Sequence, residues 1–314
     1  MSDKPRIGVS ACLIGHPVRF DGGHKRDAFI SDLLPRYFEL VPVCPEAELG
    51  LGVPRPAIRL RRTESGLRLV TGATGADLSA PMAAFSARRL EGLDGLCGFI
   101  FKKGSPSCGM ERVPVVVSEA GPRARDGVGL FARAFMDRYP LIPTEEEGRL
   151  HDPLLRESFF ERVYALDRWQ RIAEPERDRA ALQAFHGRHK LMLMARDPAA
   201  CRELGRRVAA ARPADLAARA DYIRRFMAVM ARRPDRGGHV NALMHALGYL
   251  KRALPADDRQ ELLGLFEAYR RREVPLVAPM TLLRHHLRHH ASPYLQDQHY
   301  LTPCPDGLAL RAAV

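Results

Sequence analysis

Three cysteines share a local setting that suits a metal centre. Cys12, Cys44 and Cys108 each lie at or just beyond the C-terminal end of a short apolar run, in a turn rich in Gly, Pro or Ser. The carboxyl ends of strands in an open parallel sheet meet at one edge, where ligands bind. The spacings of 32 and 64 residues match no zinc finger, because zinc fingers need closely spaced CxxC pairs. We therefore expect three thiols from three separate loops to meet at one sheet edge.

Two kinds of metal centre would accept three thiolates. Zinc takes a fourth protein ligand, or a water if the site is catalytic. An iron-sulfur cluster held by three cysteines leaves one iron open, and that iron can act as a Lewis acid towards a soft donor such as sulfur. The residue types do not distinguish zinc from an iron-sulfur cluster. A third interpretation is that the three cysteines are unrelated turn residues that bind no metal. That last interpretation suits Cys97, Cys201 and Cys304 better.

Polar side chains accompany the cysteines. Glu46 follows Cys44 by two residues and Glu48 follows it by four, while Ser105 and Ser107 precede the third cysteine. A carboxylate in a shielded cleft can act as a general acid or base, and a serine can orient a group or relay a proton. We favour Glu46 over Glu48, because the Cys-Pro-Glu turn holds it closest to the cysteine. The candidates for substrate binding are Arg19, Asp21 and Arg55.

The segments around these residues alternate between strand-like and helix-like patterns. Strands are expected at 7–12, 38–44 and 96–101, and helices at 27–37, 79–93 and 127–139. Short apolar strands separated by helices indicate βαβ units and a parallel sheet. Residues 1–150 are therefore predicted to form an α/β, three-layer, Rossmann-like domain with a mostly parallel sheet.

The C-terminal half has a different pattern. Apolar residues recur at helical spacing, as at Leu243, Leu247, Leu250 and Leu254, with Gly and Pro punctuation and no period of two. We predict six or seven helices, with a helical connector over 151–185 and an all-α domain over 186–314.

Composition bounds the class of protein. The 314 residues are 46% hydrophobic and 27% charged, and no apolar run approaches the length of a membrane span. The N-terminus lacks the pattern of a secretory signal, so we expect a cytoplasmic protein. Of the net charge of +12, residues 1–149 carry +3 and the remainder +9. A half with that charge attracts phosphate backbones, although an arginine-favouring genome would give the same bias.

Four motifs resemble the thiouracil desulfidase (TudS) family. They are Ser10-Ala11-Cys12-Leu13-Ile14-Gly15, Cys44-Pro45-Glu46, Pro54-Arg55-Pro56 and Lys103-Gly104-Ser105-Pro106-Ser107-Cys108-Gly109, within roughly residues 6 to 147. The resemblance implies that the three cysteines hold a [4Fe-4S] cluster whose fourth iron is free to take the thiocarbonyl sulfur of the substrate. It also implies that Glu46 and either Ser105 or Ser107 assist.

The C-terminal half resembles the all-helical domain fused to this core in bacterial tRNA 4-thiouridine desulfidases of the RudS type. The residues that carry the resemblance are Arg188-His189-Lys190, Gly238-His239-Val240-Asn241, His245, Gly248-Tyr249-Leu250-Lys251, Tyr294-Leu295, Gln298, Tyr300-Leu301 and Pro303. The resemblance implies a domain that engages RNA. The RNA-binding candidates are His189, Lys190, His239, Asn241, His245, Lys251 and Arg252.

The residues themselves support a contact surface on one helix. Asn241, His245, Tyr249 and Arg252 form a polar stripe that could bond phosphate and stack a base, or could pack between helices. Together these observations predict an iron-sulfur-dependent enzyme that converts 4-thiouridine in tRNA to uridine and releases sulfide. A desulfidase of free thiouracil or thionucleotides, and a non-catalytic metal-dependent RNA-binding or redox-sensing protein, are the alternatives. The oligomeric state is left open.

Overall fold

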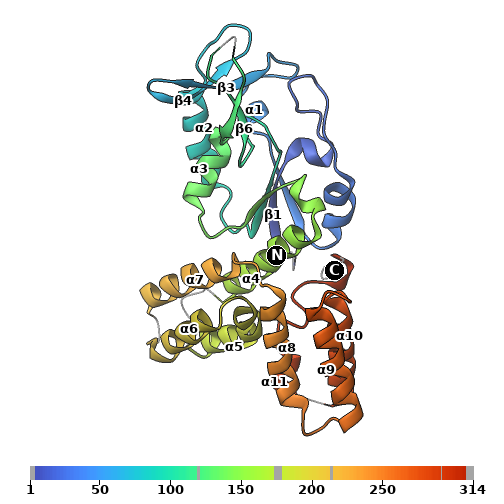
Figure 1. Ribbon diagram of the computed structural model, residues 1–314. Coiled ribbons are helices and arrows are strands. Elements are labelled where there is room, and N and C mark those ends of the chain that lie inside the picture. The colour runs from blue at the N-terminus through green and yellow to red at the C-terminus, as the bar shows by residue number, and fades with distance from the viewer. Residues whose placement is uncertain (1–3, 119–120, 173–178, 213–214, 291, 309–314) are drawn as a thin grey trace. The chain divides into compact units, whose positions relative to one another are not determined.

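The computed structural model describes residues 4–118, 121–172, 179–212, 215–290 and 292–308 (Figure 1). The chain divides into two compact units, Met1–Asp152 and Pro153–Val314. The first unit contains the strands and the second consists of helices. This agrees with the predicted α/β domain followed by an all-α domain.

Four parallel strands form the first sheet of the N-terminal unit. They are β1 (Arg6–Ser10), β2 (Glu39–Val43), β5 (Gly98–Phe101) and β8 (Thr144–Glu146), in the order β2-β1-β5-β8. Strands β1 and β5 lie in the centre and are almost wholly buried. Buried parallel strands read as continuous apolar runs rather than as alternating patterns, which is why the sequence revealed them.

A second sheet was not anticipated from the sequence. It contains β3 (Ile58–Thr63), β4 (Gly66–Thr71), β6 (Val113–Val116) and β7 (Ala124–Gly127), in the order β4-β3-β6-β7. Strands β3 and β4 form an antiparallel hairpin, β6 runs parallel to β3, and β7 is antiparallel to β6. The N-terminal unit is therefore more elaborate than a single Rossmann-like sheet.

The helices of this unit differ in part from the prediction. They are α1 (Pro45–Glu48), α2 (Ser79–Glu91) and α3 (Leu130–Arg138), with a 3-10 turn at Arg149–His151. The helix predicted over 79–93 is present, but the helix predicted over 27–37 is a π turn (Phe29–Leu33) followed by a 3-10 turn (Leu34–Arg36). Pro35 has no backbone N–H, so a regular helix cannot continue through it. The helix predicted from 127 begins only at Leu130, because Gly127 ends β7.

Aromatic side chains join the sheet to the helices beside it. The rings of Phe99 and Phe101 on β5 stack with centroids 4.2 Å apart, and Phe135 of α3 packs 4.7 Å from Phe99. Phe131, one turn earlier on α3, is buried in the same cluster. This packing fixes the N-terminal end of α3 relative to the end of β5, where the third cysteine loop starts.

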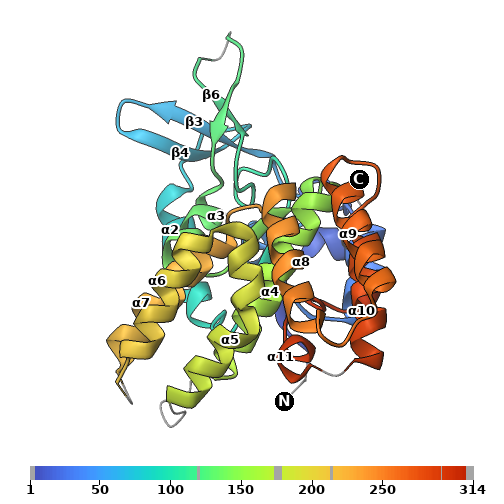
Figure 2. The same cartoon turned by 60° about the horizontal axis from the view of Figure 1, so that its bottom comes forward.

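The C-terminal unit contains, within its described residues, seven helices of thirteen residues or more. They are α4 (Pro153–Gln170), α5 (Arg179–Arg196), α6 (Pro198–Ala210), α7 (Leu216–Met230), α8 (Arg236–Leu250), α9 (Ala256–Arg270) and α10 (Val277–His289), followed by the short α11 (Pro293–Gln296). Helix α5 packs against both α6 and α8 (Figure 2). Helix α4, which the sequence assigned to a connector, lies within this unit. None of the helices described is both long and apolar enough to cross a membrane.

Candidate functional site

The three cysteines line one cavity of about 340 Å³ in the N-terminal unit. Cys12 lies in the 3-10 helix Ala11–Ile14 directly after β1, Cys44 is the N-cap of α1 directly after β2, and Cys108 lies in the loop after β5. Since β2, β1 and β5 are adjacent and parallel, their carboxyl ends bring the three thiols to one edge. All three are free thiols.

Burial disfavours the charged form of each thiol. Desolvation raises the pKa of Cys12 to about 11, and the neighbouring Cys44 adds to this effect. Desolvation likewise raises the pKa of Cys44 and that of Cys108. A thiolate in such a place needs a compensating positive charge, which a bound metal provides. The donor set therefore suits a metal centre better than a free nucleophilic cysteine.

The loop that carries Cys108 is held from two directions. The Ser105 Oγ accepts hydrogen bonds from the backbone N–H groups of Ser107 and Cys108, at 3.3 and 3.1 Å. From the other side, the first turn of α3 donates to the loop, with Leu130 N to Pro106 O at 3.2 Å and Ala132 N to Ser107 O at 3.1 Å. The free N–H groups at a helix N-terminus make these bonds possible. The loop conformation is therefore fixed before any ligand binds.

Gly129 is required for this arrangement. A Cβ at this position would lie 2.5 Å from the carbonyl carbon and oxygen of Ser107, and 2.8 Å from the backbone nitrogen of Cys108. Only glycine lets the start of α3 approach the loop so closely. The Gly that precedes α3 is thus part of the cysteine site.

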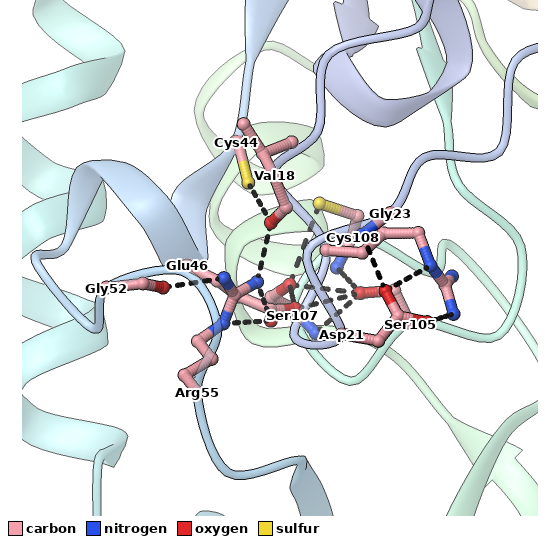
Figure 3. A network of polar contacts seen from close by, with 11 residues as sticks. Val18, Asp21, Gly23, Cys44, Glu46, Gly52, Arg55, Ser105, Ser107 and Cys108 are labelled. Atoms are coloured by element: carbon pink, nitrogen blue, oxygen red, sulfur yellow. Dashed lines mark hydrogen bonds and ion pairs between the residues drawn. The ribbon is translucent and has the colours of Figure 1, made fainter.

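Glu46 lies at the centre of a hydrogen-bonded chain in the same cavity (Figure 3). The Ser107 hydroxyl donates to Glu46 Oε1 at 2.6 Å, and the Ser105 hydroxyl is 3.0 Å from that of Ser107 and 3.4 Å from Oε1. Ser107 Oγ also lies 3.7 Å from the Cys108 Sγ. The chain links a carboxylate to the surroundings of a cysteine sulfur. Both candidate serines belong to it, and Ser107 makes the shorter bond.

Arg55 holds the opposite side of the carboxylate, a contact that the sequence did not predict. Its Nε and Nη2 donate to Glu46 Oε2 at 3.2 and 2.7 Å, Nη2 donates to Val18 O at 2.9 Å, and Nη1 donates to Gly52 O at 2.9 Å. Four of its five N–H groups are therefore engaged within the protein, and its side chain is only 3% exposed. Arg55 therefore orients Glu46, and because it also lines the cavity, its assignment to substrate binding stays a prediction.

The other two substrate-binding candidates lie nearer the surface. Arg19 lines the cavity, whereas Asp21 is exposed, is absent from the cavity wall and pairs with Arg19 at 3.4 Å. A bond from the Gly23 backbone and the Arg19 guanidinium lower the pKa of Asp21. Two residues that the sequence did not single out, Lys25 and Lys103, line the cavity as exposed cations without an ion-pair partner in the described part of the chain.

Two further residues of the site received no role in the sequence analysis, since Glu48 was ranked below Glu46 and Ser10 was named only within a motif. Glu48 is not simply solvated: it accepts a bond from the Cys44 backbone N–H at 2.8 Å and one from Arg89 at 2.7 Å. Ser10 is buried in the cavity wall, and its hydroxyl accepts from the Lys102 backbone N–H at 3.0 Å. A position four residues after a helix-capping cysteine was the available signal for Glu48.

The structure places the RNA-binding candidates of the C-terminal unit in different environments, some buried and some accessible. Two are buried, which corrects the prediction for them: His189 packs against Phe185, and His239 bonds to the Tyr300 hydroxyl at 3.0 Å. Desolvation holds the pKa of His189 well below its usual range, so the ring is a neutral core group. The residues that line a large groove are Lys190, Asn241 and His245, while Lys251 and Arg252 are exposed outside it.

No ready site for a single metal ion is present in the described residues. No group of three or more His, Cys, Asp or Glu side chains among them is arranged to hold one ion. The three thiols instead border the cavity from three separate elements.

Comparisons with known proteins agree with this division of the chain. Residues 7–147 match the family model described as 2-thiouracil desulfurase, and residues 190–305 match a family of unknown function, DUF1722. The uncharacterized protein YbgA of Escherichia coli (strain K12) is 31% identical over 157 residues, which are 48% of this chain and 90% of that protein. A solved structure described as the [4Fe-4S]-dependent thiouracil desulfidase TudS is 30% identical and has a TM-score of 0.39, covering 48% of this chain and 95% of that one.

The two family matches bear out the resemblance seen in the motifs. The cavity with the three cysteines and Glu46 lies entirely within the segment that matches the desulfurase family, and the helices that contain the groove overlap the DUF1722 segment. The chain therefore belongs to the 2-thiouracil desulfurase family through residues 7–147, and it joins that domain to a DUF1722 domain.

Proposed function

We propose that this protein is an iron-sulfur-dependent desulfidase that converts 4-thiouridine in tRNA to uridine and releases sulfide. The observation that carries the proposal is the shared cavity. Three thiols, those of Cys12 and Cys108 buried and that of Cys44 half-buried, and the chain formed by Glu46, Ser107 and Ser105 line the same 340 Å³ space. Membership of a thiouracil desulfurase family supports the reaction class.

A cluster suits this donor set better than a single ion does. The thiols of Cys12 and Cys108 are buried and that of Cys44 is half-buried; the three lie on separate elements and do not form a single-ion site among the described residues. A cluster distributes its cysteine ligands over several irons, so it can span such a cavity, and Cys12, Cys44 and Cys108 would hold it. When bound, a [4Fe-4S] cluster with three cysteine ligands supplies an open iron that binds the thiocarbonyl sulfur as a Lewis acid.

The reaction needs proton transfer but no net change of oxidation state. Exchange of sulfur for oxygen at a thiocarbonyl carbon consumes one water and releases one hydrogen sulfide. Ser107 lies 2.6 Å from Glu46 Oε1 and can relay a proton from the attacking water to this carboxylate. Glu46 is then the general base. Glu46 then returns this proton to the departing sulfur, and the second proton of the water follows by the same route when the added hydroxyl becomes the carbonyl, which completes the hydrogen sulfide. Arg55 keeps the carboxylate directed at the serines through its two bonds to Oε2.

Charge favours a nucleotide in RNA over a free base. Lys25 and Lys103 line the cavity as exposed cations without an ion-pair partner in the described residues. A neutral thiolated base forms no ion pair with these cations, whereas the phosphates that flank a nucleotide do. Residues 150–314 add a net charge of +9, which attracts a polyanion.

The test is desulfuration of matched substrates by anaerobically reconstituted full-length protein. The substrates are tRNA that contains 4-thiouridine, free 4-thiouridine and free 2-thiouracil, with loss of the thiocarbonyl absorbance and release of sulfide as readouts. We expect the highest kcat/KM with tRNA, and we expect sulfur-free tRNA to compete. Turnover of the free compounds alone would assign the protein to salvage of thiolated bases or nucleotides. Binding of tRNA without turnover of any substrate would leave a non-catalytic RNA-binding protein.

A further inference from the structure

A groove in the C-terminal unit is not used by the chemistry described above. It has a volume of about 1410 Å³ and lies along α5, α6 and the N-terminal half of α8. The contact between α5 and α8 forms its floor, and Gly238 permits this contact, because a Cβ there would lie 2.0 Å from Ala195 O. The groove is therefore a built feature of the helix packing.

Positive charge dominates its wall. Lys190, Arg202, Arg206 and Arg233 line the groove, are exposed, and have no ion-pair partner within the described residues. Among the described residues of the wall, Asp235 is the acidic one. Its Oδ1 accepts a hydrogen bond from the Gly238 N–H at 2.6 Å and so caps α8. Many other arginines of this unit are paired with carboxylates, as Arg207 and Arg225 are with Asp221. Four unneutralised cations along one groove fit a polyanion.

An aromatic platform lies at one edge of the groove. Tyr294 lines the groove and stacks on Tyr249 of α8, with ring centroids 4.4 Å apart and an angle of 26°. Tyr249 is 53% exposed. Asn241 and His245 precede it at intervals of four residues on α8, and both line the groove. The polar stripe of this helix therefore leads from the cationic wall to an exposed ring.

We propose that this groove binds an unpaired segment of RNA. The phosphates contact the four cations, and one base stacks on the exposed face of Tyr249. A ring can stack on a base only if that base is free of its own duplex stack, so the platform selects a single strand or loop over a helix. The proposal deepens the proposed function, because it takes the RNA to be the polynucleotide that carries the thiolated base.

The test measures RNA binding by the full chain in the absence of iron, so that it does not depend on desulfuration. The probes are a single-stranded oligouridylate and a blunt RNA duplex of equal length, both without sulfur. The groove variant is Arg202→Ala with Arg206→Ala, and the charge-matched control is Arg88→Ala with Arg133→Ala, exposed arginines of α2 and α3. Tyr249→Ala and Tyr249→Phe test the platform.

We expect the oligouridylate to bind more tightly than the duplex. Loss of two phosphate contacts makes the negative slope of log K against log salt less steep by about 1.4. If wild type and variant bind equally at 1 M salt, the variant then binds about 25-fold more weakly at 0.1 M salt. We expect this change for the groove variant and less than about threefold for the control. Tyr249→Ala should lose about tenfold and Tyr249→Phe should bind like wild type, since a phenyl ring still stacks.

Several results would overturn the proposal. Equal losses in the groove and control variants would mean that net charge alone attracts RNA. A duplex that binds as tightly as the single strand, with no effect of Tyr249→Ala, would exclude an unpaired segment. Specific groove binding together with absent desulfuration of tRNA would instead refute the proposed function and leave this inference standing.

Discussion

The buried pair of Glu46 and Arg55 gives a prediction that separates structure from chemistry. Glu46→Gln preserves the shape of the side chain, and its single amide oxygen can still accept from Arg55 while its NH2 group donates to the Ser107 hydroxyl. It removes the negative charge that faces a guanidinium only 3% exposed to solvent. A buried cation without its counterion costs about 3 to 5 kcal/mol. Because Gly52 O and Val18 O still accept from Arg55, we expect the lower end, about 3 kcal/mol.

The same substitution should affect turnover far more than stability explains. General acid–base catalysis contributes roughly 10²- to 10⁴-fold, so kcat should fall by that factor under conditions in which the variant is fully folded. Denaturant unfolding of the metal-free protein gives the stability, and sulfide release gives kcat. The matched control is Asp126→Asn, which removes a carboxylate from the exposed pair with Arg62 and should cost less than about 1 kcal/mol. A kcat for Glu46→Gln within about threefold of wild type would refute the acid–base role.

Three further predictions concern the cavity wall and the cysteine loop. In metal-free protein, burial raises the pKa of Cys12 from 9.0 to about 11. The free energy of unfolding should therefore fall by about 3 kcal/mol as the pH rises from 9 through 11, because only the unfolded chain ionises this thiol readily. The same pH profile of the unfolding free energy in Cys12→Ala would contradict this. Gly129→Ala should cost about 1 to 3 kcal/mol through overpacking, whereas Gly264→Ala in α9, where a Cβ meets nothing within 4 Å, should be neutral or stabilising; equal effects in urea unfolding would argue against the close contact. Lys25→Ala with Lys103→Ala should raise the KM for thiolated RNA by up to about 25-fold at 0.1 M salt through two lost phosphate contacts and leave the KM for free 2-thiouracil unchanged; equal changes in the two KM values in steady-state assays would contradict the phosphate argument.

The sequence predicted the cysteine edge because the strands that lead to it contain apolar runs: β1 and β5 are almost wholly buried, and the more exposed β2 ends in the buried Val43. The apolar runs around Val9, Val43 and Ile100 are continuous, and each ends in a turn that contains Gly, Pro or Ser. The adjacency of β2, β1 and β5 then follows from parallel pairing. The second sheet escaped because β3 and β4 are rich in arginine and only partly buried, so their strand pattern is weak.

Side-chain roles were harder to predict than elements. Arg55 was assigned to substrate binding, but an arginine in a motif near a carboxylate can bond either to that carboxylate or to a bound substrate. The fold shows that four of its N–H groups bond within the protein. His189 was assigned to RNA because it lies in Arg188-His189-Lys190, a segment that carries the resemblance to the RNA-engaging helical domain. Its position one turn after Phe185 places it on the buried face of α5, where a neutral imidazole is tolerated.

Metal analysis of anaerobically purified protein tests the central claim most directly. Iron, acid-labile sulfide and zinc are measured in the wild type and in Cys12→Ala, Cys44→Ala and Cys108→Ala, with Cys97→Ala as a control for loss of a buried thiol outside the cavity. We predict about four irons and four sulfides per chain in the wild type and the control, and loss of both in each cavity variant. Stoichiometric zinc, or iron that is indifferent to the three cavity cysteines, would contradict the account.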